Sequence, residues 1–156
     1  MSDSRVFRPA IGVGVLVWRD QQLLLGKRIS KDQNYCWQFP GGHLESSESV
    51  IDCARREVLE ETSLKIKGLR HLGFTDKPFV VAQRQYITLL VSCVYESGNA
   101  QTLEPDKCEA WQWFDYPQLP APLFEPIKIF MSQQDDLYAL HNASQILPDT
   151  PSVERK

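Results

Sequence analysis

The sequence lacks the features that mark membrane proteins and non-specific nucleic-acid-binding proteins. No apolar run approaches the roughly 20 residues of a membrane span, and the first residues, "MSDSRVFRPA", contain no apolar stretch of the kind found in secretory signals. The formal net charge of −3 offers no basic excess for a nucleic-acid backbone. These absences predict a cytoplasmic protein that binds neither a membrane nor a nucleic-acid polymer.

Cysteine is scarce, and its spacing excludes two further classes. The chain has 4 cysteines and no CxxC pair. Without paired spacing, neither a zinc site nor a disulfide framework is predicted. Three of the four lie in apolar surroundings, so we expect reduced thiols that belong mostly to the core.

What is present is an ordinary globular composition with both strand-like and helical segments. The chain has 156 residues, of which 42% are hydrophobic and 24% charged. We therefore expect a single domain over residues 1–156, with an ordered core at about 9–145 and frayed ends. The expected strands are 10–18, 23–28, 37–39, 66–76, 86–97 and 108–114, and the expected helices are 49–63 and 123–140. This pattern predicts an α+β fold, a mixed β-sheet sandwiched between helices.

The first helix has a clear beginning and an apolar stripe. Ser49 with Asp52 three residues later resembles a capping box, so the helix is expected to start at Ser49. Helical spacing places one set of side chains on the face toward the sheet: Val50, Ile51, Ala54, Val58 and Thr62. The Pro-Gly-Gly segment at 40–42 is expected to stop the preceding strand.

Two glutamates border this stripe. Glu57 and Glu61 are an i,i+4 pair, and like charges at that spacing cost roughly 0.2–0.5 kcal/mol. Solvated surface glutamates are the ordinary explanation, with Arg56 as an i,i+4 partner of Glu60. A position beside a buried face adds a desolvation cost to the repulsion. A divalent cation such as Mg²⁺, which prefers oxygen ligands, would relieve both costs.

The surrounding residues match a known signature. Gly42 is followed after five residues by Glu48, and after seven more by the run "REVLEE" at 56–61. This arrangement resembles the Nudix box, the signature of hydrolases that cleave a nucleoside diphosphate linked to another group. One position departs, because Ser63 stands where the box has a glycine that normally ends the helix. The departure removes no ligand.

The resemblance extends beyond the box. The stretches "GVGVLV", "LLLGKR", "WQFPGGHLE", "EPDKCEAWQWF" and "LPAPLF" are similar to the MutT-type nucleoside triphosphate diphosphatases, in the branch that includes the thiopurine nucleotide diphosphatase. The resemblance implies the Nudix α/β/α sandwich and a nucleotide substrate, cleaved to nucleoside monophosphate and pyrophosphate. It also implies Mg²⁺ as cofactor, with Mn²⁺ as a substitute, and a homodimer.

Residue roles follow from the same resemblance. Glu57 and Glu61 match metal ligands, and the backbone carbonyl of Gly41 matches another. Glu60 matches either a further ligand or an outer-shell acceptor. Either Glu61 or Glu57 could serve as the general base, with Glu61 favoured. The residues to which the resemblance gives catalytic roles are Glu48, Arg56, Glu57, Glu60 and Glu61, of which Glu48 and Arg56 orient the ligand carboxylates.

Candidate substrate contacts lie outside the run of glutamates. Lys27 and Arg28 end a strand near the glycines and could neutralise phosphates, although a solvated strand end is the alternative. His43 could contact phosphate or base, or be a polar loop residue. Phe124 matches a loop that lines the base pocket, where an aromatic face can stack on a base, and Thr88 is expected to face the same pocket.

The function predicted from these residues is Mg²⁺-dependent hydrolysis of (deoxy)nucleoside triphosphates, including modified or oxidised ones, to monophosphate and pyrophosphate. One alternative is a Nudix hydrolase of ADP-ribose or nucleotide sugars, to which Pro78 points, although Lys77 and Pro78 also fit a plain turn. Another is a catalytically silent nucleotide-binding module. Such modules usually lose box glutamates, and this chain retains them.

Overall fold

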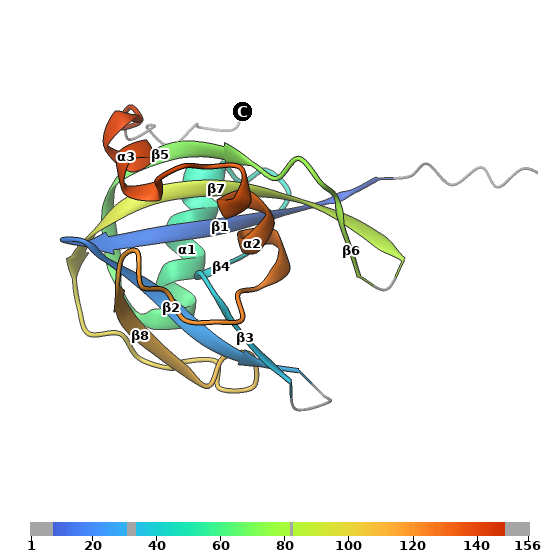
Figure 1. Ribbon diagram of the computed structural model, residues 1–156, viewed down its shortest axis with the longest axis horizontal. Helices are drawn as coiled ribbons and strands as arrows, with labels where there is room; N and C mark the ends of the chain where they lie inside the picture. Colours follow the sequence, from blue (N-terminus) through green and yellow to red (C-terminus); the bar gives the residue numbers. More distant parts are fainter. Residues whose placement is uncertain (1–7, 31–33, 82, 149–156) are drawn as a thin grey trace, which may run out of the picture.

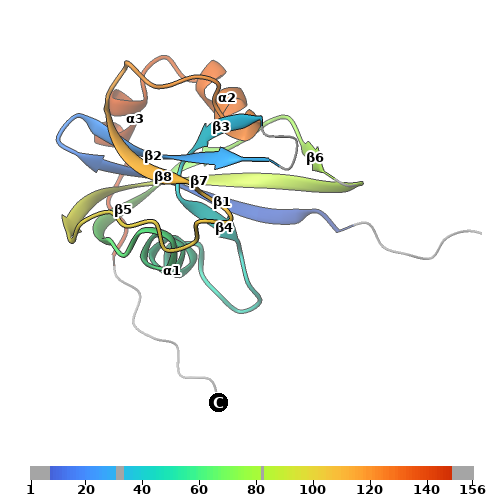
Figure 2. The same cartoon turned by 90° about the horizontal axis from the view of Figure 1, so that it is seen from below.

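A mixed eight-stranded β-sheet lies between two helical layers. The computed structural model describes residues 8–30, 34–81 and 83–148. Helix α1 covers one face of the sheet, and α2 and α3 cover the other (Figures 1 and 2). The elements are β1 Ala10–Arg19, β2 Gln22–Ile29, β3 Tyr35–Gln38, β4 Gly41–His43, α1 Val50–Thr62, β5 Lys65–Phe74, β6 Phe79–Val81, β7 Arg84–Ser97, β8 Ala110–Asp115, α2 Glu125–Ser132 and α3 Leu137–Ala143. The predicted α+β sandwich is confirmed.

Strand β1 is the centre of the sheet and is shared by three neighbours. The strand order is β3-β2-β1-β7-β5, with β4 on β1, β6 on β7 and β8 on β2. Strand β1 runs parallel to β7 along nine residue pairs. It pairs with β2 only at Trp18 and Arg19, and with β4 at Gly12, Val13 and Gly14. This fork brings the glycines of β4 to the middle of the sheet.

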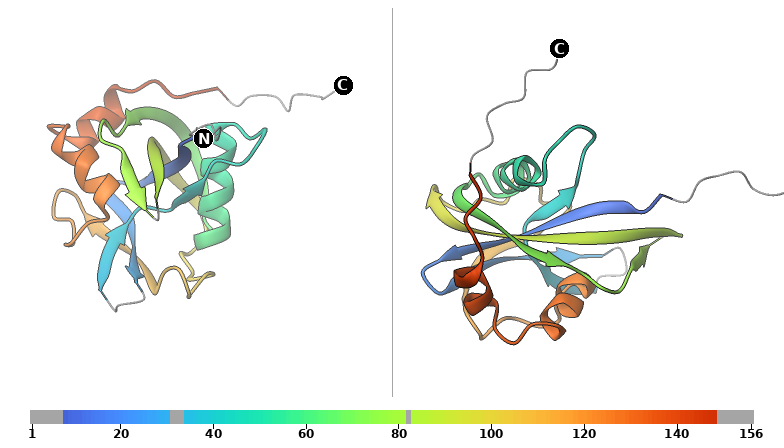
Figure 3. Two further views of the ribbon diagram at one scale, coloured as in Figure 1. Left: turned by 90° about the vertical axis from the view of Figure 1, so that its right-hand side faces the viewer. Right: turned by 90° about the horizontal axis from the view of Figure 1, so that it is seen from above.

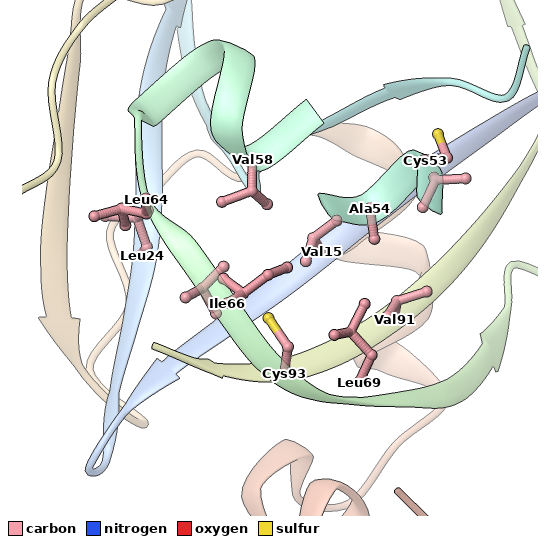
Figure 4. Close-up of a cluster of buried hydrophobic side chains, with 12 residues drawn as sticks. Val15, Leu24, Cys53, Ala54, Val58, Leu64, Ile66, Leu69, Val91 and Cys93 are labelled. Atoms are coloured by element: carbon pink, nitrogen blue, oxygen red, sulfur yellow. The ribbon is translucent and has the colours of Figure 1, made fainter. Parts of the chain in front are cut away.

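Side chains of β1 alternate between two cores, as the period of a strand requires. Val13, Val15 and Val17 belong to the core beneath α1. Figure 4 shows Val15 in this cluster, with Ala54 and Val58 of the helix above it. The stripe predicted on the helix is therefore the face that packs on the sheet: Ala54, Val58 and Thr62 are buried, and Val50 and Ile51 pack against this core.

Helices α2 and α3 lie on the face of the sheet opposite α1 (Figure 3). The second core lies beneath these two helices. Leu16 and Trp18 of β1 enter it together with Phe130 of α2 and Leu137 of α3. All four cysteines are free, and Cys53, Cys93 and Cys108 are buried, which confirms that most of the cysteines belong to the core. In the described part of the chain, no helix is long and apolar enough to cross a membrane.

Local structure departs from the sequence-based expectations at three places. Strand β3 ends at Gln38, before the Pro-Gly-Gly segment as predicted, but residues 41–43 then form a further strand, β4, because they pair with β1. The short strand β6 was missed; its three residues pair only with β7. The expected helix 123–140 is two helices, since α2 ends at Ser132 and Asp136 caps α3 by accepting from two backbone N–H groups. Most of the residues expected to be frayed lie outside the described ranges, but Leu147 donates to the carbonyl of Leu69.

Both ends of α1 agree with the sequence. Ser49 accepts a hydrogen bond from the backbone N–H of Asp52, so the predicted capping residue is confirmed. At the other end Ser63 has φ 64°, in the left-handed region, and its N–H donates to the carbonyl of Leu59. Ser63 thus adopts the conformation that favours glycine at a helix C-terminus.

Replacing Ser63 by glycine should stabilise the protein by about 0.5–1 kcal/mol, because glycine has no Cβ to clash in the left-handed region. Chemical denaturation measures the change. Ser144→Gly is the control: Ser144 ends α3 with φ −85° and its hydroxyl donates to Leu140, so glycine there should destabilise. A loss of stability in Ser63→Gly would contradict the explanation.

A buried polar cluster fixes α3 to the sheet. Trp18 donates its indole N–H to the Ser92 hydroxyl at 2.9 Å, and Ser92 also hydrogen-bonds Nδ1 of His141. His141 is buried. Burial, with a contribution from the charge of Arg70, lowers the pKa of His141 from 6.5 to about 4. The folded state therefore binds a proton less readily than the unfolded state.

This difference predicts a loss of stability in acid that is specific to His141. The free-energy cost of keeping His141 unprotonated in the folded state is absent well above pH 6.5 and grows as the pH falls from 6.5 toward 4. The stability advantage of the wild type over His141→Gln should shrink by about 2 kcal/mol between pH 7 and pH 5. Urea unfolding at the two pH values measures it, with the exposed His71→Gln as control. A pH-independent difference would be the contrary result.

Candidate active site

The two glutamates at the edge of the α1 stripe face each other in a desolvated position. Glu61 is 5% exposed, and the side chain of Glu57 is 13% exposed. Burial is the largest cause that raises the pKa of Glu61 from 4.5 to about 8, and the charge of Glu57 and a hydrogen bond between the two carboxyl groups add to it. The N–H of Gly41 donates to Glu61 Oε1 at 2.9 Å and opposes the shift. Ionising both carboxyl groups therefore costs free energy unless a cation binds beside them.

Arg56 holds the acidic side chains in place. Its Nε and Nη2 donate to the two carboxylate oxygens of Glu48 at 2.6 and 3.0 Å, a bidentate pair. Its Nη1 donates to Glu57 at 2.8 Å and to Glu60 at 3.2 Å. The hydrogen bond from Arg56 is the main cause that lowers the pKa of Glu48 to about 2. These contacts match the orienting role that the resemblance implies for Glu48 and Arg56.

The two glycines of β4 are required by close approach. A Cβ on Gly41, whose φ is 157°, would lie 2.0 Å from the backbone carbonyl oxygen of Val13. A Cβ on Gly42 would lie 2.5 Å from the carboxylate of Glu57. A side chain is excluded at Gly41 by the backbone of Val13, and a side chain at Gly42 would displace the Glu57 carboxylate.

Two cavities meet at these glycines. The acidic cavity, of about 760 Å³, is lined by the carboxylates of α1 and by the β7–β8 loop. The apolar cavity, of about 260 Å³, lies between the sheet and the start of α2. The residues that line both cavities are Arg28, Gln38, Gly41, Gly42 and His43. A molecule with a planar apolar part and a charged part could occupy both at once.

The structure brings most of the predicted substrate contacts together. Arg28, His43, Thr88 and Phe124 all line the apolar cavity, and the guanidinium of Arg28 lies 4.9 Å from the ring centre of Phe124. Lys27 lines neither of these cavities. Its ammonium lies 3.9 Å from Glu109 and 4.7 Å from the ring centre of Tyr35, as a solvated strand end would.

Sequence reasoning missed other lining residues. In the apolar cavity they include Tyr86, which stacks on His43 with ring centres 5.4 Å apart, and Phe79, which packs edge-on against Phe124 at 5.5 Å. On the acidic side they include Glu104, Asp106 and Lys107. The β6–β7 pairing that places Phe79 opposite Tyr86 has no local signal in the sequence. "EPDK" is visible as a charged loop, but its position opposite α1 depends on tertiary structure.

The donor set suits a cation that takes few protein ligands. In the ranges that the structure describes, no three His, Cys, Asp or Glu side chains converge as a preformed cage. Arg56 holds Glu57 and Glu60, and Gly41 holds Glu61. Two facing carboxylates remain a fitting site for Mg²⁺, which usually takes one or two carboxylates and completes its shell with water and substrate phosphate.

The chain belongs to the Nudix family, because a family model described as the NUDIX domain matches residues 8–134. An RNA pyrophosphohydrolase of Hydrogenovibrio crunogenus is 30% identical over an alignment of 133 positions that covers 74% of this chain and 78% of the relative. An RNA pyrophosphohydrolase of Erwinia tasmaniensis is 26% identical and covers 100% of this chain and 99% of its own length. A MutT NUDIX hydrolase from Burkholderia pseudomallei has a TM-score of 0.71 at 29% identity, covering 81% of this chain and 98% of that chain.

Family and site together define the class of enzyme. The protein is a Nudix pyrophosphohydrolase that acts on a nucleotide-containing substrate. The expectation that nucleic-acid polymers are not partners stays a prediction, since the named relatives are RNA pyrophosphohydrolases.

Proposed function

We propose that the protein is a Mg²⁺-dependent nucleoside triphosphate diphosphatase that releases nucleoside monophosphate and pyrophosphate, with modified and oxidised nucleotides among its substrates. The observation that carries this proposal is the junction of the two cavities at Gly41, Gly42 and His43. The apolar cavity accommodates a base, and the acidic cavity accommodates phosphates that arrive with cations. The structural neighbour from Burkholderia pseudomallei is itself described as a MutT NUDIX hydrolase, in keeping with the MutT-type resemblance of this chain.

The chemistry requires water to attack a phosphorus atom shielded by negative oxygens. Bound Mg²⁺, held by Glu57 and Glu61 with Glu60 and the Gly41 carbonyl, would neutralise that charge and activate the water. Arg56 and Glu48 keep the carboxylate of Glu57 oriented through the contacts described above. Glu61 or Glu57 accepts the proton of the attacking water, since both border the acidic cavity.

A second candidate is hydrolysis of the terminal triphosphate of an RNA chain. It is favoured by the RNA pyrophosphohydrolases that align over most or all of this chain. The net charge of −3 counts against it, because RNA binding generally uses a basic surface. The further alternatives are hydrolysis of ADP-ribose or nucleotide sugars and a silent binding module. The silent module is disfavoured by the intact cluster of Arg56 and the glutamates.

A substrate panel separates these candidates. Products are measured for nucleoside triphosphates, an RNA oligonucleotide with a 5′-triphosphate, ADP-ribose and nucleotide sugars, each with Mg²⁺ and with EDTA. We expect the highest kcat/KM for free triphosphates and no turnover in EDTA. Preference for the RNA, or for the diphosphate-linked compounds, would replace the proposal, and no Mg²⁺-dependent turnover on any substrate would favour the silent module.

Base selectivity should be modest. The base-side lining is mainly apolar, led by Phe124, and stacking tolerates every base. Apolar pockets separate similar ligands by about 10–200-fold, so several triphosphates should fall within that range. Phe124→Ala should weaken all of them together, whereas Phe74→Ala, an exposed residue that lines neither cavity, should not. A ratio of many thousandfold for one base, measured as kcat/KM, would contradict the apolar pocket.

The single domain over residues 1–156, the homodimer and the cytoplasmic location are part of the same proposal. The homodimer and the location follow from resemblance and composition. Analytical ultracentrifugation of the whole chain tests the homodimer, for which a sedimenting species of twice 17.9 kDa is expected.

A further inference from the structure

The β7–β8 loop forms the wall of the acidic cavity that faces α1. Glu104, Asp106 and Lys107 line the cavity from this loop. Backbone bonds fix the loop to the rest of the fold: the N–H of Gln101 donates to the Thr62 carbonyl at 2.9 Å, and the N–H of Glu109 donates to the Lys27 carbonyl at 2.7 Å. The loop is thus held at the C-terminal end of α1 and beside β2.

Lys107 is held by Glu104 through both its backbone and its side chain. Its backbone N–H donates to the Glu104 carbonyl at 3.0 Å, and its ammonium lies 2.8 Å from a carboxylate oxygen of Glu104. Its side chain is 70% exposed, so the ammonium can change partner at little packing cost. Glu57 and Glu61 line the same cavity as Lys107, so Lys107 borders the space next to the proposed metal ligands.

The cavity offers few cations to a phosphate. Among the described residues that line it, the lysines and arginines are Arg28, Arg56 and Lys107. The guanidinium of Arg56 is already bonded through all three nitrogens, to Glu48, to other glutamates and to the His43 carbonyl. Arg28 lies at the rim shared with the apolar cavity, over the ring of Phe124. Lys107 is therefore the cation that lines the cavity from the β7–β8 loop, opposite α1.

We propose that Lys107 is a substrate-binding residue that contacts the diphosphate part of the substrate, the part released as pyrophosphate. This inference rests on the proposed function and adds a binding residue to it. When a triphosphate enters, its negative oxygens compete with Glu104 for the ammonium, which has three donors and a flexible stem. Lysine is a common point-charge partner of phosphate. Lys107 then holds the leaving group on the side of the cavity opposite α1.

The test compares Lys107→Gln and Lys107→Arg with the wild type in the full-length protein. Lys107→Gln should raise KM for a triphosphate and the dissociation constant of inorganic pyrophosphate in the presence of Mg²⁺ by about three- to tenfold. Lys107→Arg should recover most of both losses. Mg²⁺ affinity without nucleotide should be unchanged or tighter in Lys107→Gln, since a positive charge near the carboxylates is removed. Lys67→Gln, exposed on β5, is the matched control.

The outcomes separate this inference from the proposed function. A wild type that hydrolyses triphosphates, with Lys107→Gln unchanged in KM and in pyrophosphate affinity, would overturn the role of Lys107 alone. A lower melting temperature with those constants unchanged would give Lys107 only a loop-anchoring role and would also overturn it. A wild type without Mg²⁺-dependent triphosphate hydrolysis would overturn the proposed function, while pyrophosphate binding still tests Lys107.

Discussion

Glu61→Gln should lower turnover by several orders of magnitude and, in EDTA, make the protein more stable than the wild type. The loss of activity follows from removing a proposed metal ligand. The gain in stability follows from the raised pKa of Glu61 in the folded state, about 8 against an ordinary 4.5. The carboxyl group stabilises the fold fully below pH 4.5, and this contribution is lost as the pH rises through 8. Glutamine keeps the size and shape of the side chain but cannot ionise, so the variant does not lose this stability as the pH rises.

The gain should therefore depend on pH. Relative to wild type, Glu61→Gln should gain about 2–4 kcal/mol between pH 5 and pH 8 in EDTA, measured by urea unfolding. Glu96→Gln, exposed at the end of β7, should change neither activity nor pH dependence. Near wild-type turnover in Glu61→Gln would refute the ligand role, and a pH-independent stability would refute the desolvated carboxyl pair.

Gly42→Ala should separate activity from folding. The new Cβ would lie 2.5 Å from the carboxylate of Glu57, and that carboxylate is the end of a flexible side chain. We expect Glu57 to move away, so stability should fall by less than about 1 kcal/mol, while kcat/KM should fall about 100-fold or more because a proposed ligand is displaced. Steady-state kinetics and thermal unfolding of the same preparation measure the two effects.

Gly41→Ala provides the contrast. Its Cβ would meet the backbone carbonyl of Val13 at 2.0 Å, and backbone in the centre of a sheet cannot move aside cheaply. Unfolding or a loss of several kcal/mol is expected there. If Gly42→Ala instead unfolds the protein while Gly41→Ala tolerates the substitution, the assignment of these two contacts is wrong.

The sequence was most informative where a local sequence pattern was compatible with only one local structure. Ser49 and Asp52 located the start of α1, and the spacing of Ala54, Val58 and Thr62 identified its buried face. The cost of placing Glu57 and Glu61 beside that face indicated a cation site before any family was considered. Each inference depends only on helix geometry and the cost of desolvating charge.

The sequence was least informative where partners come from distant segments. Gly41 and Gly42 have the composition of a turn, yet they form a strand, because the fork between β1 and β2 leaves an unpaired stretch of β1 beside them. The stacking of Tyr86 on His43 depends on the parallel alignment of β7 with β1. Lys107 faces α1 only because its loop is bonded to the helix end. No local pattern encodes these long-range contacts.

The central claim is that the carboxylates of α1 support Mg²⁺-dependent release of pyrophosphate from a nucleoside triphosphate. The most direct measurement is the identification of both products after incubation of one triphosphate with the wild-type protein and Mg²⁺, repeated in EDTA and with Glu61→Gln. The expected result is nucleoside monophosphate and pyrophosphate in equal amounts, with neither product in EDTA and little in the variant. Release of nucleoside diphosphate and orthophosphate, or turnover that persists in EDTA, would contradict the claim.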